Sequence, residues 1–285
     1  MVSRYLPANK IIDWLISQTA KPLFLVGGAV RDALLQRKSR DYDFLLEGDS
    51  IALVKGLQKK FAGEAIFNPR FLTATWRIGD LIFDFATARE EIYLEPGALP
   101  LVKPTNWFND LKRRDFTINT LLIPLEENGW GEIIDLFGGK RDLERGLLRI
   151  LSASSFRDDP TRILRALRYQ NRLGFSIAGE TLKLLKESWP YLQKIAPRRR
   201  FKEWRLLCAE KEVSKNIQAI FYLGGWTAFF KSLSFYPDWD ESKAISKWDT
   251  YLALLLAREP EKLDELAEYW GLYPRERSKI ERALK

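Results

Sequence analysis

The stretch FLVGGAVRDALLQRKSRDYDFLLEG, residues 24–48, decides the fold. It predicts a buried strand that ends at two glycines, then a helix, then a second strand. Asp41 and Asp43 are two residues apart, so their carboxylates project from one side of that second strand, while Tyr42 and Phe44 face the other side. Two adjacent carboxylates repel each other unless a cation lies between them, and such oxygen ligands suit Mg²⁺. For an isolated pair, a solvated edge strand is the more frequent explanation.

The neighbouring residues favour chemistry over a solvated strand. Glycines between a strand and a helix let backbone N–H groups approach a phosphate, and Gly27-Gly28 occupy such a position, although many glycine pairs only form tight turns. Arg31, in the first turn of the helix, could reach the same anion. Asp84 lies in the apolar strand LIFDFAT, where a charge without a partner is costly, so it is a third candidate carboxylate.

Composition excludes several kinds of catalyst. The 285 residues include no histidine and one cysteine, so a Ser-His-Asp triad, a histidine-ligated zinc site and a disulfide framework cannot form. Catalysis must use carboxylates, metals and arginines. The net charge of +8, mostly located after residue 110, suits a polyanion such as nucleic acid. No apolar run approaches the ~20 residues of a membrane span, and no signal peptide is evident, so we expect a cytoplasmic protein without membrane association.

The order of elements predicts an α+β protein. Strands and helices mix through the first 90 residues, and FLTATWRI and LIFDFAT read as a hairpin joined by Gly79-Asp80. Residues 91–112, with several prolines, read as a long irregular loop. From about residue 140 onward only helices are expected, including helices over 157–173, 179–188 and 198–210.

Five segments occur in a specific order: LVGGAVRD, DYDFLL, DLKRRDFTINTLL, IIDLFGGKRDLERGLLRIL and FRDDPTRILRALRYQNRLGF. Together they resemble the class II nucleotidyltransferases, the family of bacterial tRNA nucleotidyltransferases and poly(A) polymerases, from about residue 22 to residue 178. The resemblance implies a polymerase-β-like head with a mixed sheet and helices, followed by an all-helical neck and body. We expect the head over residues 1–140, a neck that recognises the nucleotide base over 141–212, and an RNA-binding body with a shortened tail over 213–285.

The resemblance also implies roles for the acidic residues. Asp41 and Asp43 would bind the catalytic Mg²⁺, two ions in all, and Asp84 would help to activate the 3′-hydroxyl of the acceptor. Further residues implied to bind the incoming nucleotide, in the head, are Gly28, Arg31, Arg114 and Asp115.

The segment DDPTRILRALR carries the implied base recognition. Asp159 and Arg162 match an Asp and an Arg that pair with the base edge of CTP or ATP in place of a nucleic-acid template. Arg165 and Arg168 match further nucleotide-binding positions. From the residues alone, Asp159 and Arg162 could equally form an ion pair at a helix start. The family often has Glu-Asp where this chain has two aspartates, which puts only the helix cap in doubt.

Three consecutive arginines begin a later helix. Arg198, Arg199 and Arg200 could contact RNA phosphates, and a solvated helix start is the alternative. The predicted function is template-independent addition of C and/or A to the 3′ end of tRNA at the acceptor stem, with release of pyrophosphate and no partner protein evident. Full CCA addition, CC addition, A addition and poly(A) synthesis all remain open. A non-catalytic RNA-binding protein and a nucleotidyltransferase with a small-molecule acceptor are the competing hypotheses.

Overall fold

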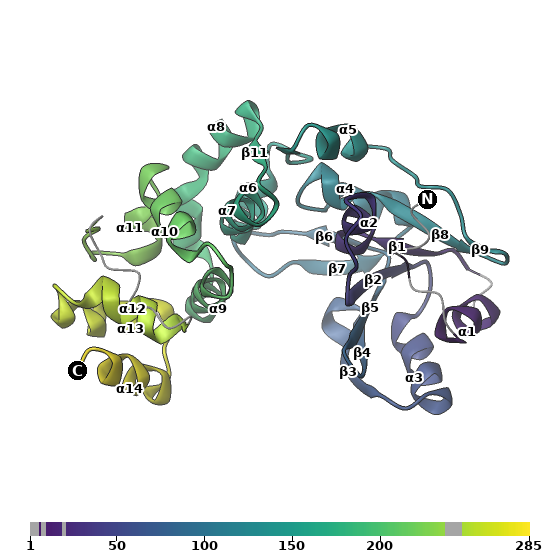
Figure 1. The fold of residues 1–285 in the computed structure, drawn as a ribbon, viewed down its shortest axis with the longest axis horizontal. Coiled ribbons are helices and arrows are strands. Elements are labelled where there is room, and N and C mark those ends of the chain that lie inside the picture. The colour runs from purple at the N-terminus through teal and green to yellow at the C-terminus, as the bar shows by residue number, and fades with distance from the viewer. Residues whose placement is uncertain (1–5, 7–9, 19–20, 237–246) are drawn as a thin grey trace. The chain divides into compact units, whose positions relative to one another are not determined.

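The computed structural model describes residues 6, 10–18, 21–236 and 247–285 (Figure 1). The chain divides into two compact units. The head unit comprises Met1–Ile92, Pro100–Arg145 and Arg149–Leu151, and the helical unit comprises Tyr93–Leu99, Gly146–Leu148 and Ser152–Lys285.

The head unit is built on a seven-stranded sheet with the order β3-β4-β5-β2-β1-β8-β9. Only β2 and β5 pair in parallel and the other neighbours are antiparallel, so the sheet is mixed, as predicted. The strands are β1 (Leu23–Val26), β2 (Asp41–Leu46), β3 (Glu64–Asn68), β4 (Thr73–Ile78), β5 (Leu81–Thr87), β8 (Leu122–Glu126) and β9 (Gly129–Trp130). The α-helices of this unit are α1 (Lys10–Gln18), α2 (Gly28–Leu34), α3 (Ser50–Lys60), α4 (Trp107–Lys112) and α5 (Gly139–Glu144).

One face of the sheet carries an aromatic core. Tyr42 stacks on Phe83 with ring centroids 5.5 Å apart, and Phe44 stacks on Phe85 at 4.9 Å. The indole of Trp76, on β4, adds to this layer at 5.5 Å from the Phe83 ring. These residues alternate with the aspartates along β2 and β5, so burying the aromatic rings turns Asp41, Asp43 and Asp84 to the opposite face.

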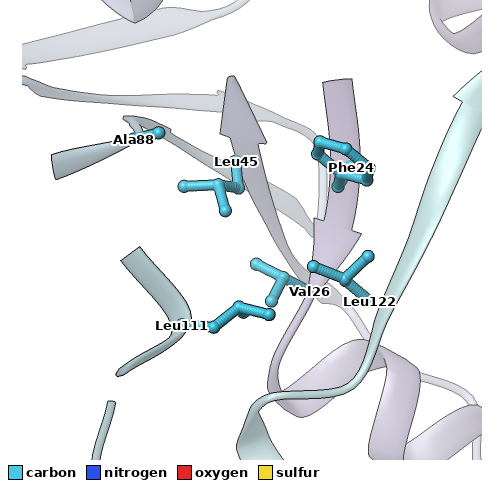
Figure 2. Close-up of a cluster of buried hydrophobic side chains, with 6 residues drawn as sticks. All are labelled: Phe24, Val26, Leu45, Ala88, Leu111 and Leu122. Atoms are coloured by element: carbon cyan, nitrogen blue, oxygen red, sulfur yellow. The ribbon is translucent and has the colours of Figure 1, made fainter. Parts of the chain in front are cut away.

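A smaller apolar cluster lies on that opposite face (Figure 2). Val26 is the register partner of Asp43, and Phe24 is the partner of Leu45, so the cluster begins immediately beside the acidic residues. Leu111 of α4 is fully buried in it. Packing of Leu111 on the sheet therefore anchors α4 and fixes the position of the residues that follow the helix.

Residues 91–112 are more regular than predicted. Strands β6 (Arg89–Ile92) and β7 (Leu101–Pro104) pair antiparallel in a separate two-stranded sheet, and α4 follows them. Pro104 is the last residue of β7, where the missing N–H of a proline is tolerated because the strand is at an edge. The prediction of an irregular loop gave too much weight to the prolines.

The helical unit departs from the prediction in two details. Two short strands, β10 (Leu147–Leu148) and β11 (Ser176–Ile177), pair in parallel within it. The helix predicted over 157–173 is interrupted between α6 (Ser155–Asp158) and α7 (Thr161–Leu173), where Asp159 is extended with φ −129° and ψ 93°. A residue that precedes proline is disfavoured in the helical conformation, which explains the break.

A second aromatic core lies between α9, α11 and α13 of the helical unit. The remaining α-helices of this unit are α8 (Gly179–Ser188), α9 (Pro197–Cys208), α10 (Val213–Tyr222), α11 (Trp226–Phe230), α12 (Trp248–Leu256), α13 (Leu263–Trp270) and α14 (Pro274–Ala283). Trp204 and Trp270 are fully buried with ring centroids 5.5 Å apart, and Phe230 packs against both. None of the helices in the described part of the chain has the length and apolar character that a bilayer-spanning helix needs.

Candidate functional site

The three predicted carboxylates lie on one face of two adjacent strands of the head unit. Asp43 is the register partner of Asp84 across the parallel β2–β5 pair, and Asp41 is the partner of Ile82. Asp43 and Asp84 are half-buried, whereas Asp41 is exposed at the start of β2. The register therefore brings Asp84 beside Asp43, with Asp41 two residues further along the same face.

Thr75 is a partner of Asp84 that the sequence reasoning missed. It lies opposite Asp84 on β4, and its Oγ1 hydroxyl donates to Oδ1 of Asp84. The hairpin turn at Gly79-Asp80 sets this register, so the pairing could have been read by counting back from the turn. The hydroxyl restrains the orientation of the carboxylate.

The chemistry of these carboxylates fits a magnesium ion. Among the described residues, no three side chains of His, Cys, Asp or Glu gather closely enough to hold a metal ion by themselves. Mg²⁺ in nucleotide-binding sites usually takes only one or two protein carboxylates and completes its coordination with water and substrate phosphates. Asp41 and Asp43, two residues apart on one face of β2, offer hard oxygen donors in that number.

Gly27 lies next to the Asp43 carboxylate and the Arg114 guanidinium. It precedes α2 with φ 73° and ψ −128°, a conformation that side chains rarely adopt. A Cβ atom at this position would lie 3.5 Å from Oδ2 of Asp43 and 3.5 Å from Nη1 of Arg114. Gly27 is therefore the glycine at which a carboxylate and a guanidinium come together, and nucleotide binding by the adjacent Gly28 stays a prediction.

Asp110 holds Arg114 in this position. Its fully buried carboxylate binds Nη2 of Arg114 at 3.2 Å and Nη2 of Arg113 at 2.7 Å. Burial alone would raise the pKa of Asp110, but the guanidiniums of Arg114 and Arg113 outweigh burial and lower it below the usual value. Arg113 also binds Glu91 at 2.7 Å, so only Arg114 of the two arginines reaches the Gly27 region. Asp110 lies three residues before Arg113 and four before Arg114, so helical spacing could have indicated these two ion pairs from the sequence.

A chain of polar contacts links Arg31 to Asp115. Nη1 of the buried Arg31 donates to Oδ1 of Asn119 at 2.8 Å, and Nδ2 of Asn119 donates to Oδ1 of Asp115 at 3.0 Å. Asn119, which the sequence reasoning did not single out, therefore connects two of the predicted nucleotide-binding residues. Their contacts with a nucleotide stay predictions.

In the helical unit, Asp159 is held from two sides. Its Oδ1 accepts hydrogen bonds from Oγ1 of Thr161 at 2.7 Å and from Nη2 of Arg199 at 2.9 Å. Arg162, three residues later, is buried and donates from Nη1 to the Ser155 hydroxyl at 2.8 Å. The loop between α6 and α7 and the first turn of α9 thus fix the predicted base-reading acid.

Arg165 and Arg168 follow on α7. Nη2 of Arg165 donates to the Tyr169 hydroxyl at 3.1 Å. Arg168 donates from Nε to Glu210 at 3.0 Å and lies 3.6 Å from the buried Glu203. Burial raises the pKa of Glu203, although the charge of Arg168 opposes this rise. These contacts with Glu203 and Glu210 tie α7 to α9 and to the residues after it.

The three arginines predicted to bind RNA all make internal contacts. Arg199 binds Asp159 and donates to the carbonyl of Gly97 at 2.8 Å. Arg198 binds Glu276 at 3.1 Å and lies over the ring of Tyr273.

Arg200 is buried and donates to the carbonyls of Ile195 at 2.8 Å and Tyr269 at 3.1 Å. Burial also lowers its pKa. Position 200 falls on the inward face of α9, together with Phe201, Trp204 and Leu207, and a contact of Arg200 with RNA stays a prediction.

Comparison with known proteins gives a consistent result. Residues 23–149 match the family described as the Poly A polymerase head domain. The chain is 47% identical over 178 residues to an A-adding tRNA nucleotidyltransferase of Aquifex aeolicus, which covers 62% of this chain and 22% of that protein. It is 38% identical over 234 residues to an A-adding tRNA nucleotidyltransferase of Halalkalibacterium halodurans, covering 80% of this chain and 55% of that protein.

The structural comparison covers more of the relative. A tRNA nucleotidyltransferase solved with a primer tRNA and an incoming ATP analogue superposes with a TM-score of 0.78 at 30% identity, covering 95% of this chain and 82% of the other. The chain spans a fifth to about half of the length of the two curated relatives, but most of this solved chain. Sequence, register and superposition agree, and the chain belongs to the family of tRNA nucleotidyltransferases and poly(A) polymerases.

Proposed function

We propose that this protein transfers nucleotidyl groups from ATP and/or CTP to the 3′ end of tRNA without a nucleic-acid template. The observation that carries the proposal is the pairing of Asp43 with Asp84 on one face of the sheet, next to Gly27 and Arg114. A nucleoside triphosphate and a hydroxyl acceptor require acidic groups on one side and cationic or amide donors on the other.

The reaction assigns a task to each of these groups. The 3′-oxygen of the RNA forms a bond to the α-phosphorus of the triphosphate, the bond to the bridging oxygen breaks, and pyrophosphate leaves with its electron pair. Asp84 would accept the proton of the 3′-hydroxyl, and Arg114 and the backbone at Gly27 would face the phosphates. Asp41 and Asp43 would hold Mg²⁺, which when bound stabilises negative charge on the attacking and leaving oxygens.

Base selection belongs to the helical unit. Asp159 offers an acceptor and Arg162 offers a fork of donors, the two kinds of group that can pair with the edge of a cytosine or an adenine. Arg199 supports this task because it restrains the Asp159 carboxylate from the first turn of α9. Arg114, Arg31 and Asp115 would contact the ribose and phosphates, and Arg165 and Arg168 would support the bound nucleotide.

Among the variants of the activity, we favour A addition. The two curated relatives reported above are both named A-adding tRNA nucleotidyltransferases. CC addition, complete CCA synthesis and poly(A) synthesis share the same core residues and are the alternatives.

The test uses four tRNA transcripts that end before the CCA tail, after C, after CC and after CCA. Each is incubated with the protein, Mg²⁺ and labelled ATP or CTP. Addition of one A only to the CC transcript supports the favoured variant, and the other patterns of extension identify the alternatives. If no transcript is extended, the proposed function is wrong. Labelling of a small-molecule hydroxyl in place of RNA would point to the small-acceptor hypothesis.

A further inference from the structure

Asn119 is a buried amide that contacts a cation and an anion of the head unit. Its Oδ1 accepts from Nη1 of Arg31 at 2.8 Å, and its Nδ2 donates to Oδ1 of Asp115 at 3.0 Å. All three residues are at most 8% exposed. An amide carries both an acceptor and a donor, so it can satisfy a guanidinium and a carboxylate at once. The same two partners exclude the flipped amide, which would turn its NH₂ group toward the guanidinium and its oxygen toward the carboxylate.

The backbone around Asn119 is anchored in the interior of the head unit. Asn119 is the last residue of η3 (Thr117–Asn119), a short 3-10 helix. The hydroxyl of Thr117 donates to the buried carboxylate of Asp142 at 2.7 Å, and Ile118 is fully buried. The hydroxyl of Thr120 donates back to the carbonyl of Thr117 at 2.7 Å. Buried groups whose hydrogen bonds are satisfied make a structure rigid, so Asn119 is a firm support for the side chains that it contacts.

Asn119 lies at the turn that joins β1 to α2. A Cβ atom on Gly27 would lie 3.9 Å from the backbone oxygen of Asn119, and a Cβ atom on Gly28 would lie 3.6 Å from Nη2 of Arg31. This turn is the region proposed above to face the triphosphate. The link through Asn119 therefore runs along the edge of the candidate site rather than through a remote part of the core.

The direction of the Asp115 carboxylate is set by its neighbours. Its Oδ1 accepts from the backbone N–H of Phe116 at 2.8 Å and from Nδ2 of Asn119 at 3.0 Å. Both donors reach the same oxygen from different parts of η3 and its start. Because hydrogen bonds are directional, the two together fix the rotation of the carboxylate and the direction in which Oδ2 points.

A carboxylate beside a triphosphate can bind only some parts of a nucleotide. When ionised it accepts hydrogen bonds and donates none, and it repels phosphate oxygens. Apart from the base, the hydrogen-bond donors of a nucleoside triphosphate are the hydroxyls of its ribose. A site built around a substrate hydroxyl rejects an analogue without that hydroxyl, because a buried polar group then loses its partner. The orientation of Asp115 therefore bears on the choice of sugar.

We propose that Asn119 is a positioning residue that aims Asp115 at the ribose and thereby makes the site selective for ribonucleotides over deoxyribonucleotides. Arg31 holds the oxygen of the amide, and this contact directs the NH₂ group at Asp115. The inference rests on the proposed function for the nucleotide and names the class of sugar that the site takes.

The test measures the choice of sugar in Asn119→Asp and Asn119→Ala. The aspartate keeps an acceptor for Arg31 but turns a second carboxylate oxygen toward Asp115, and the alanine removes both contacts. Asn128→Asp, at an exposed position between β8 and β9, is the matched control. Each protein is loaded with a fluorescent ATP analogue in the presence of Mg²⁺, and ATP, 2′-deoxy-ATP and 3′-deoxy-ATP are used to displace it.

We expect the affinity for ATP to fall about tenfold in both Asn119 variants, as the loss of one charge-assisted hydrogen bond would give. At least one of the two deoxy analogues should keep its native affinity, which also shows that the variants are folded. The preference for the ribonucleotide over that analogue then falls by the same factor. Asn128→Asp should keep the native preference.

Three outcomes would overturn the inference. An equal loss of affinity for ATP and both deoxy analogues would show that Asn119 only supports the fold. An unchanged preference in both variants would show that Asn119 does not aim Asp115, and a native protein that binds all three nucleotides equally would show that there is no selectivity to explain. If the expected shifts appear while no tRNA transcript is extended, the proposed transfer is wrong and the inference stands for nucleotide binding.

Discussion

Arg199 donates a hydrogen bond from Nη2 to Oδ1 of Asp159 at 2.9 Å and thereby restrains the acid proposed to read the incoming base. The same guanidinium donates to the carbonyl of Gly97 at 2.8 Å, at the tip of the β6–β7 hairpin. Arg199, predicted from the sequence to contact RNA, is therefore better placed to position Asp159.

Replacing Arg199 should blur nucleotide choice. In Arg199→Gln, Asp159 loses a charged donor, and we expect discrimination between ATP and CTP to fall about tenfold, as expected for one charge-assisted hydrogen bond. Steady-state kcat/KM for each nucleotide measures this ratio. Arg199→Lys should recover part of the discrimination, and Arg275→Gln, at an exposed position on α14, serves as the control. An unchanged ratio in Arg199→Gln would assign Arg199 to another role.

Asp43→Asn should abolish transfer while leaving tRNA binding intact. The change removes a charge worth several kcal/mol of transition-state stabilisation, which corresponds to about a thousandfold in rate. Single-turnover incorporation and tRNA anisotropy measure the two properties. Asp80→Asn is the matched control because Asp80 is exposed at the β4–β5 turn, where it forms a 3.4 Å surface pair with Arg40. A parallel loss of tRNA binding in Asp43→Asn would show that Asp43 is structural.

Thr75→Val should slow the transfer step. The variant keeps the shape of the side chain but loses the hydroxyl that donates to Asp84, the proposed acceptor of the 3′-hydroxyl proton. Proton transfer to a positioned side chain contributes about 10²- to 10⁴-fold in rate, and part of this contribution depends on the orientation of the carboxylate. We expect the single-turnover rate of nucleotide transfer to fall about tenfold, with tRNA binding unchanged. Thr75→Ser should behave like the native protein, and a rate that is the same in all three proteins would contradict this role.

The lowered pKa of Asp110 predicts that the free energy of unfolding depends on pH. Its pKa is lower in the folded protein than in the unfolded chain, so its ionised form stabilises the fold above the unfolded value of about 3.9. This contribution disappears as the pH falls through the lowered folded value. Asp110→Asn should therefore reduce the free energy of unfolding near pH 7 by about 3 to 5 kcal/mol, because two guanidiniums lose their buried partner.

Urea denaturation at several pH values checks this prediction. The difference between Asp110→Asn and the native protein should shrink as the pH falls below about 4, since the native carboxylate then becomes protonated as well. A difference that stays constant with pH would show that shape and hydrogen bonding, rather than charge, account for the effect.

Local patterns predicted the arrangement of the acidic strands. Alternation along β2 placed Asp41 and Asp43 opposite the aromatic layer, and Gly79-Asp80 located the β4–β5 turn, whereas the register that brings Asp84 beside Asp43 came from the structure. Such periodicity and turn chemistry depend on neighbouring residues alone, which is why a sequence reveals them. The mixed sheet and helical remainder of the family fold were likewise confirmed.

Contacts between distant segments could not be predicted in this way. Asn119 joins Arg31 to Asp115 across the head unit, and the folded chain alone reveals this link. Two other features of the structure, which were not predicted, are indicated by neighbouring residues in the sequence. The break at Asp159 follows from the proline after it, and the burial of Arg200 follows from its position on the same helical face as Trp204 and Leu207.

The single parallel pairing in the sheet has a consequence for folding. Asp43 and Asp84 meet only through the β2–β5 pair, and α3, β3 and β4 lie between these strands in the chain. The neighbouring pairs β1–β2, β3–β4, β4–β5 and β8–β9 join segments that are close in the chain and can form while β2–β5 is still open, whereas β1–β8 closes an even longer connection. Closing a long connection is slow, so an intermediate with most of its secondary structure would still lack the acid pair. During refolding, the return of activity should therefore lag behind the return of the far-ultraviolet circular dichroism signal.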